Sequence, residues 1–455
     1  MAIQSKNPAT LEIIQTYEEI SDNELEIKLK KAQEAYLKWK NTSFEERAKL
    51  FLKLADYLKT NKSEMAKLAT MEMGKTLSAG ESEIEKSALT CEYYAENSVN
   101  FLNSEKVTTN ASESYIRYDS FGVLLAVMPW NFPFWQVYRF AAPALMAGNT
   151  AILKHASNVP ACAEMIEKSF TDCGFPEGVF QNIFLGSTRV EKVIRDPRIV
   201  AVALTGSEKA GASVASIAGS EIKKCVLELG GSDPFIVFAD ADIDLSAEIA
   251  LASRMSANAG QACNGAKRFI VHNDVFESFS KKLIELFSKI IVGDPSKINT
   301  TMGPLATEQI MLDVKKQTEK SIDMGAKILY KGNIPEMKGH FYPPIILSNV
   351  KKGMPVYDEE VFGPVVPIIT FSNDEEALEI ANDTIYGLGA TIMTSDIDKA
   401  KVFAKKINAG NIFINAQVKS DPRVPFGGIK RSGYGRELGN YGIKEFVNIK
   451  TVWVK

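Results

Sequence analysis

The chain has 455 residues and a formal net charge of −3, and 24% of its residues are charged and 45% hydrophobic. This composition is typical of a globular protein of two or three domains, and it excludes the basic stripe on which nucleic-acid-binding proteins depend. The most apolar stretch, residues 121–135, is too short and too interrupted by proline to span a membrane. Because the sequence starts with neither a signal-peptide nor a transit-peptide pattern, a cytoplasmic location is expected.

The five cysteines and three histidines are scattered along the chain. They form no CxxC pair and no HExxH cluster, so neither a disulfide framework nor a metal site is predicted. Most of the cysteines should be reduced and buried as small hydrophobic residues.

The first hundred residues predict a helical scaffold. Apolar residues recur at three-to-four spacing over residues 23–40, 43–60 and 81–103, which is the period of an amphipathic helix. Ser43 and Glu46 have the spacing of a capping box at the start of the second helix.

Residues 112–128 change to an alternating pattern rich in β formers, which predicts a β-hairpin. Strands and helices then alternate, and Pro160 and Gly174 mark the start and the end of a helix over residues 160–173. This alternation predicts a parallel sheet with crossover helices. The expected strands cover residues 150–155, 179–185, 199–206 and 224–229.

A second series of strands and helices begins near Asp233. Two α/β units in tandem place a cleft between them, and ligands usually bind in such clefts. The expected strands cover residues 234–238, 268–272, 326–330, 366–371 and 410–415, and the expected helices cover residues 243–259 and 274–289.

The turn at residues 204–211 follows an apolar strand and opens a helix. Its glycines, Gly206 and Gly211, allow backbone N–H groups to approach a phosphate, and the helix N-terminus adds partial positive charge. The turn lacks the GxGxxG fingerprint of dinucleotide-binding folds. From these residues alone, a nucleotide site and a plain strand-to-helix turn fit the pattern equally well.

Three further positions have side chains suited to acyl chemistry. Cys263 lies among small and polar residues, which suits a thiol that a ligand reaches, although a small residue in a helical turn is the simpler interpretation. Glu228 lies between apolar residues, where burial makes a carboxylate a usable base, although a lone glutamate is more often paired with a lysine. The amide of Asn131 is suited to stabilising an oxyanion, although its aromatic neighbours also suit a packed loop.

Together these residues fit one type of reaction, in which a cysteine attacks a carbonyl group. Cys263 would attack as the thiolate, and Glu228 is the candidate base. No histidine has a suggestive setting, which weakens the alternative of a Cys–His hydrolase. A dependence of turnover on NAD(P) would separate the two.

The sequence resembles the aldehyde dehydrogenase family in an ordered set of motifs over nearly the whole chain. Any one motif occurs by chance, but the ordered set is highly specific. The motifs are PWNFP at 129–133, the segment around Lys154, GSxxxG at 206–211, LELGG at 227–231, GQxC at 260–263, EVFGPV at 360–365 and PFGGxKxSG at 425–433.

The resemblance implies a role for individual residues. Cys263 would form a thiohemiacetal with an aldehyde, and the Asn131 side chain and the Cys263 backbone N–H would bind its oxyanion. After hydride transfer to the nicotinamide, Glu228 would activate the water that hydrolyses the thioester. The residues implied to bind the dinucleotide cofactor are Trp130, Lys154, Ser157, Gly206, Ser207, Gly211, Leu229, Glu360 and Phe362.

One departure from the family pattern concerns the cofactor. Many NAD-preferring relatives have a glutamate three residues after the lysine that corresponds to Lys154, where it would bind the adenosine-ribose hydroxyls, but here the residue is Ser157. Because serine removes a carboxylate that would repel a 2′-phosphate, NADP is expected to be preferred, with NAD also accepted.

Within the family, the chain length and the segments KHAS and SDPRVPFGGIKRSGYGREL are most similar to short bacterial succinate-semialdehyde dehydrogenases. This implies that Arg139 binds the carboxylate of the aldehyde, with Trp135 and Ser420 as candidates for the same pocket. A second arginine of some relatives is Ala257 here. An Arg139 on a helix surface, and a broad specificity for aliphatic aldehydes, therefore stay open as alternatives.

The family fold implies an α/β architecture of three parts. A Rossmann-like dinucleotide-binding domain would cover residues 1–110 and 127–231, an α/β catalytic domain residues 232–430, and a β oligomerisation arm residues 111–126 and 431–455. Since the arm suits strand pairing across subunits, a homodimer or homotetramer is expected.

Two alternatives keep the fold but change the activity. A CoA-acylating dehydrogenase would keep the cysteine, but such relatives generally lack the glutamate of LELGG, which disfavours this alternative. A non-catalytic protein of the same fold would not need Cys263, Glu228 and Asn131, all of which are present.

Overall fold

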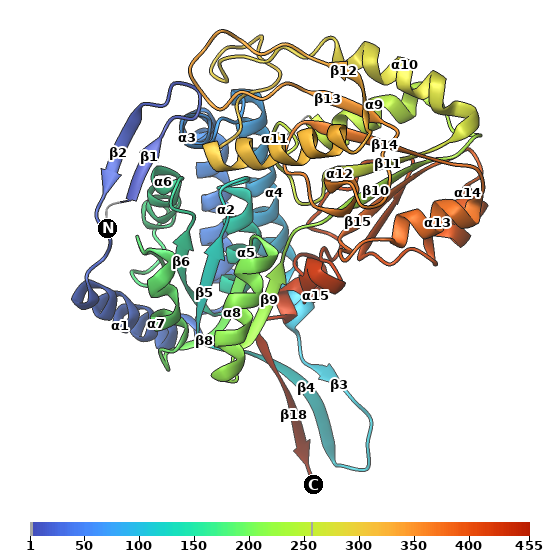
Figure 1. Ribbon diagram of the computed structural model, residues 1–455. Helices are drawn as coiled ribbons and strands as arrows, with labels where there is room; N and C mark the ends of the chain where they lie inside the picture. The colour runs from blue at the N-terminus through green and yellow to red at the C-terminus, as the bar shows by residue number, and fades with distance from the viewer. Residues whose placement is uncertain (1–2, 256–257) are drawn as a thin grey trace.

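The computed structural model describes residues 3–255 and 258–455. Two large sheets, each with helices on both faces, form the body of the protein, and a narrow β arm projects from it (Figure 1). Ala257, and the adjoining part of the helix predicted over residues 243–259, lie outside the described residues.

The first half of the body is built on a six-stranded sheet with the order β17-β9-β8-β5-β6-β7. Neighbouring strands run parallel, apart from β17, which pairs antiparallel with β9. The prediction of a parallel sheet with crossover helices is confirmed for this half. The strands are β5 Val123–Met128, β6 Thr150–His155, β7 Phe180–Asn182, β8 Ile199–Thr205, β9 Lys224–Glu228 and β17 Gly433–Tyr434.

Helices cover both faces of this sheet because both faces are apolar. One face packs against α1, α7 and α8, and the other packs against α2 to α6. With both faces covered, the carboxyl ends of the strands form the edge at which such sheets bind ligands. The helices are α1 Asp22–Trp39, α2 Phe44–Thr60, α3 Lys62–Met73, α4 Leu77–Leu102, α5 Trp135–Met146, α6 Pro160–Asp172, α7 Val190–Ile194 and α8 Glu208–Ser220.

The second half is built on a seven-stranded sheet with the order β12-β13-β14-β11-β10-β15-β16, in which β12 alone runs antiparallel to its neighbour. One face packs against α9 to α12 and the other against α13 and α14. The strands are β10 Asp233–Val237, β11 Ala266–His272, β12 Lys327–Lys331, β13 Ile345–Ser348, β14 Val365–Phe371, β15 Gly389–Met393 and β16 Asn411–Ile414. The helices are α9 Ile243–Met255, α10 Phe276–Phe287, α11 Glu308–Asp323, α12 Pro355–Asp358, α13 Asp374–Asn382 and α14 Ile397–Ala404.

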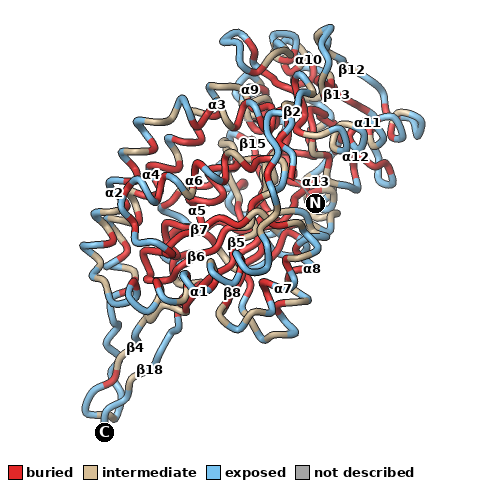
Figure 2. Tube along the Cα trace, turned by 90° about the vertical axis from the view of Figure 1, so that its left-hand side faces the viewer, coloured by how far each residue is buried: buried red, intermediate tan, exposed pale blue. Residues whose placement is uncertain are grey.

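The β-hairpin predicted over residues 112–128 is wrong. β4 (Glu113–Ser120) pairs with β18 (Val447–Val454) and β3 (Glu105–Lys106) in the projecting arm, whereas β5 lies in the six-stranded sheet. The two strands differ in burial, because β5 is an interior parallel strand and β4 lies in the exposed arm (Figure 2). Residues 123–126, which the sequence assigns to the arm, therefore lie in the body of the protein.

The predicted helical scaffold is confirmed by α1, α2 and α4. The capping box is confirmed as well, since the Glu46 N–H donates to Ser43 Oγ at 3.1 Å and the Ser43 N–H donates to Glu46 Oε2 at 2.7 Å. Within the described residues, no helix combines the length and the apolar content needed to cross a bilayer. The remaining elements are an N-terminal hairpin of β1 Ile3–Lys6 and β2 Ile13–Tyr17, and α15 Gly439–Lys444.

Candidate active site

A cavity of about 430 Å³ lies between the two halves of the body. Its wall combines side chains of α4 and α5 with the loop that follows α9 and with the segment after β16. The predicted nucleophile and all three predicted substrate residues line it. They are Cys263, Arg139, Trp135 and Ser420.

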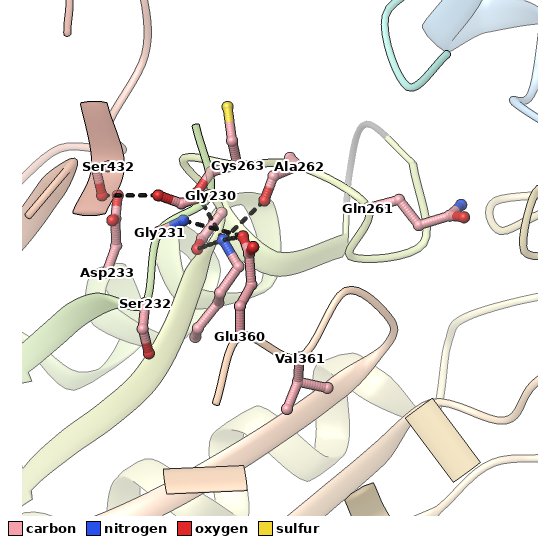
Figure 3. A network of polar contacts seen from close by, with 12 residues as sticks. Gly230, Gly231, Ser232, Asp233, Gln261, Ala262, Cys263, Glu360, Val361 and Ser432 are labelled. Carbon is pink, nitrogen blue, oxygen red and sulfur yellow. Dashed lines mark hydrogen bonds and ion pairs between the residues drawn. The ribbon is translucent and has the colours of Figure 1, made fainter. Parts of the chain in front are cut away.

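Cys263 lies on a loop that is held through its carbonyl groups. The buried Lys267 ammonium donates to the carbonyl oxygens of Ala262 at 2.9 Å and Cys263 at 2.6 Å, and it pairs with Glu360 Oε1 at 3.2 Å. Glu360 Oε1 also accepts the Gly231 N–H at 3.0 Å. The Cys263 side chain points away from this network (Figure 3), so the loop is fixed while its thiol stays available.

The Cys263 thiol is not ionised by its surroundings. Burial raises its pKa to about 11, even though the positive charges of Lys267 and Arg139 act in the opposite direction. Attack as the thiolate therefore requires a base at neutral pH. The other four cysteines are buried, as predicted.

Asn131 is locked against the loop that carries the thiol. Its Nδ2 donates to the Gln261 carbonyl at 3.1 Å, and its own carbonyl accepts from Asn258 Nδ2 at 2.9 Å. Gln261 is fully buried and its Oε1 accepts the Ala306 N–H at 2.9 Å. The Asn131 amide is therefore fixed. It contacts Gln261, which precedes Cys263 by two positions in the sequence.

Glu228 ends β9 and is 3% exposed. Burial, and after it the negative charge of Glu437, raise the pKa of the Glu228 carboxyl well above its usual range. No ion pair joins Glu228 to a lysine in the part of the chain that the structure describes, and the cations that act on it are Arg139 and Arg436. Glu228 is therefore a buried carboxyl group, and the alternative of a lysine-paired glutamate does not fit.

Several predicted cofactor residues gather at one edge of the six-stranded sheet. Trp130 follows β5, Lys154 and Ser157 lie at the end of β6, and Gly206 and Ser207 follow β8. β5 lies between β6 and β8, so the connections that leave β5 and β6 run to opposite sides of β5. Doubly wound sheets bind dinucleotides in the crevice that forms at such a point. Ser207 also caps α8, because its Oγ accepts the Ala210 N–H at 3.3 Å.

Gly211 and Leu229 make a packing contact. A Cβ added at Gly211 would lie 2.6 Å from Leu229 Cδ2, so glycine lets α8 approach the end of β9. Phe362 meets the Trp130 ring edge-on, with 5.8 Å between the ring centroids. The contact between Phe362 and Trp130 joins the carboxyl edge of the sheet to the segment that carries Glu360.

The interpretation of Arg139 as a surface residue is wrong. It lies in α5, where every residue is buried, and it is 2% exposed. Its Nε pairs with Glu437, and its Nη2 donates to Thr205 Oγ1 at 3.3 Å. The guanidinium therefore lines the cavity with two of its nitrogens already engaged.

The profile of the aldehyde dehydrogenase family matches residues 1–452. The chain belongs to the aldehyde dehydrogenase family. A Synechocystis sp. relative named probable succinate-semialdehyde dehydrogenase (NADP+) is 50% identical to it over 100% of both chains. A Mycobacterium tuberculosis relative named succinate-semialdehyde dehydrogenase (NADP+) 1 is 48% identical over 100% of both chains. The crystal structure of succinic semialdehyde dehydrogenase from Streptococcus pyogenes in complex with NADP+ matches with a TM-score of 0.97 and 40% identity, again over 100% of both chains.

Membership of the aldehyde dehydrogenase family decides two of the alternatives. The chain is an enzyme of the aldehyde-oxidising type, so neither a cysteine hydrolase nor a non-catalytic binding protein describes it. The family fold expected from the motifs is also confirmed by the match to solved aldehyde dehydrogenase structures.

Sequence reasoning missed three charged residues of this aldehyde dehydrogenase site. Lys267 fixes the nucleophile loop, Glu437 pairs with Arg139 and acts on Glu228, and Lys86 on α4 lines the cavity. Lys267 follows the nucleophile by four residues and Glu437 ends the GRE segment, so both lie beside motifs that the sequence shows. Lys86 has no such signal.

Proposed function

We propose that this enzyme oxidises succinate semialdehyde to succinate and uses NADP in preference to NAD. The observation that carries the proposal is the cavity itself, in which the Cys263 thiol shares one space with basic and hydroxyl side chains suited to a distal carboxylate. The relatives named as NADP-dependent succinate-semialdehyde dehydrogenases support the same substrate and cofactor.

The reaction begins with the thiol of Cys263. Once the thiol proton has passed to water in the cavity, the thiolate attacks the aldehyde carbon, and the oxyanion that forms would lie against the Asn131 amide and the Cys263 backbone N–H. A bound NADP would accept the hydride that the thiohemiacetal carbon must lose to become a thioester. Glu228 takes a proton from the water that hydrolyses the thioester, and the raised pKa of its carboxyl group makes the ionised form a stronger base.

The residues at the carboxyl edge of the six-stranded sheet fit a dinucleotide phosphate cofactor. The N-terminus of α8, next to Ser207, offers backbone N–H groups and partial positive charge, and Lys154 adds a cation. Bound NADP supplies the hydride acceptor that none of the side chains in the cavity provides.

The cofactor preference is predicted to reverse in Ser157→Glu. Ser157 is exposed at the turn between β6 and α6, so a glutamate there would repel a 2′-phosphate and bind free ribose hydroxyls. We expect the ratio of kcat/KM for NADP to that for NAD to fall by about 10- to 100-fold, corresponding to one lost charge-assisted contact. Steady-state rates with both cofactors measure it, and an unchanged ratio would show that Ser157 does not meet the 2′-phosphate.

The substrate is tested by comparing succinate semialdehyde with butanal, an uncharged aldehyde of similar length, in the presence of NADP. We expect kcat/KM for succinate semialdehyde to exceed that for butanal by at least about 10-fold, because a buried carboxylate contact is worth more than a methyl group. Equal values would favour the alternative, a broad aliphatic aldehyde dehydrogenase. Formation of an acyl-CoA on addition of CoA would instead support the acylating alternative.

We further propose that the arm joins copies of this chain into a homodimer or homotetramer. β18 is the outer strand of the arm and exposes Ile449 and Trp453, so it offers a strand edge and apolar side chains to a second copy. Light scattering would then give two or four times the chain mass of 50.1 kDa. A cytoplasmic location stays a prediction.

A further inference from the structure

Lys86 is a basic residue of the cavity that takes no part in the proposed reaction. It lies on α4 and lines the same cavity as Cys263. We propose that Lys86, together with Ser420, binds the distal carboxylate of the substrate and sets the preference for carboxylate-bearing aldehydes. This inference rests on the proposed function and names the residue that would give that function its specificity.

The position of the Lys86 ammonium supports this role. Its Nζ donates to Ser420 Oγ at 2.7 Å and lies 4.2 Å from the centre of the Trp135 ring. Ser420 and Trp135 are themselves buried residues of the cavity wall. An ammonium, a hydroxyl and an aromatic face thus converge at one place, and the first two are donors suited to a carboxylate.

Lys86 is partly buried in the cavity wall, and its ammonium lacks an anionic partner in the part of the chain that the structure describes. Within the described residues, no ion pair joins Lys86 to a carboxylate, while the two fully buried lysines near it, Lys75 and Lys267, pair with Glu83 and Glu360. Burying an ammonium without a counter-charge costs free energy unless a ligand supplies the charge. An anionic substrate would supply it.

The charges around Lys86 favour the binding of a carboxylate. Burial, and then the positive charge of Arg139, lower the pKa of Lys86 to about 8, while Glu83, Asp421 and Cys263 act in the opposite direction. A carboxylate placed beside Nζ would favour the charged ammonium and so be bound more tightly than a neutral group.

Arg139, the other cation of the cavity, is less free to bind a substrate. Its Nε pairs with Glu437 and its Nη2 donates to Thr205, and both of these partners are buried. A substrate carboxylate at Arg139 would have to share the guanidinium with the Glu437 carboxylate. Within the described residues, the only hydrogen-bond partner of the Lys86 ammonium is the neutral Ser420 hydroxyl.

Lys86→Met tests the proposal, because methionine keeps the length of the side chain and removes its charge. We expect the ratio of kcat/KM for succinate semialdehyde to that for butanal to fall by about 10- to 100-fold, mainly through a higher KM for succinate semialdehyde. Lys86→Arg keeps a cation and should retain most of the ratio. Lys419→Met removes an exposed charge from the rim of the same cavity, and it should change the ratio by less than about threefold if contact and not general attraction decides.

Inhibition by the product provides a second measurement that does not depend on turnover of the semialdehyde. Succinate should inhibit butanal oxidation by the native enzyme more strongly than butyrate does, and Lys86→Met should remove most of that difference. Thermal unfolding of each variant checks that it folds, and Lys86→Gln replaces the methionine variant if that one does not.

The outcomes separate this inference from the proposed function. If the native enzyme shows no preference for succinate semialdehyde over butanal, the proposed function fails and this inference fails with it. If the native enzyme has the preference and Lys86→Met keeps it, the function stands and the inference is overturned. An equal loss for both aldehydes would also overturn it, since Lys86 would then have only a structural role.

Discussion

Cys263→Ala is expected to lower kcat for aldehyde oxidation by about 10⁴-fold or more, which is the scale of losses seen when a covalent nucleophile is removed. The reason is that the cavity offers the aldehyde carbon one thiol, and Cys263 carries it. Cofactor binding should be retained, because the Cys263 loop is held by Lys267 and Gln261 through backbone groups that alanine preserves.

A buried cysteine elsewhere is the matched control for this variant. Cys173→Ala removes a buried thiol at the end of α6 that does not line the cavity, so it should leave kcat close to that of the native enzyme. Substantial turnover by Cys263→Ala, measured as reduced cofactor formed per subunit, would show that the reaction does not pass through this thiol.

Glu228→Gln is expected to lower the steady-state rate by about 10²- to 10⁴-fold, which is the range for removal of a general base. Glutamine keeps the shape of the buried side chain but does not accept a proton. If Glu228 acts on the water of the hydrolytic step, the variant should still form about one reduced cofactor per subunit in a rapid first phase and then slow down.

The pH dependence gives this variant a second signature. The raised pKa keeps the Glu228 carboxyl protonated at low pH, so the basic form, and with it the hydrolytic rate, should increase as the pH rises through that pKa. Because Glu437 is close enough to raise the same pKa, the titration belongs to the pair. Glu228→Gln should lose this rise. A variant that lacks the rapid first phase would place Glu228 in the activation of Cys263 instead.

Sequence patterns predicted helix ends correctly where contacts between residues close in the sequence determine them. The capping box at Ser43 and the helix ended by Gly174 follow from backbone hydrogen bonding within a few residues, and both are present. The strands β4 and β5 were harder to assign, because both are rich in β formers and are joined by two residues. Only the long-range partners of each strand, β18 and β6, decide to which sheet it belongs.

The candidate site shows the same division between local and long-range information. Cys263, Glu228 and Asn131 were predicted because a resemblance over the whole chain named them, while the residue types alone left other interpretations open. The aromatic segment that follows Asn131 was interpreted from its composition, and its α5 helix, buried on all sides, does not show the polar face on which periodicity depends.

Lys86 was missed for the opposite reason. It lies in a helix whose charged residues suggest a solvated face, and lysine in such a helix is usually exposed. What places it in the cavity is contact with Trp135 and with Ser420, which is 334 residues away in the sequence. Burial that depends on so distant a segment leaves no trace in local spacing.

In the proposed reaction, Cys263 carries the acyl group of a carboxylate-bearing aldehyde. The most direct measurement is the intact mass and peptide map of the enzyme, acid-quenched during turnover of succinate semialdehyde with NADP, in the native protein and in Glu228→Gln. We expect a mass increase of one succinyl group on Cys263, present on a larger fraction of the Glu228→Gln protein and absent without the cofactor. Turnover without any adduct in either protein, or an adduct on a different residue, would contradict it.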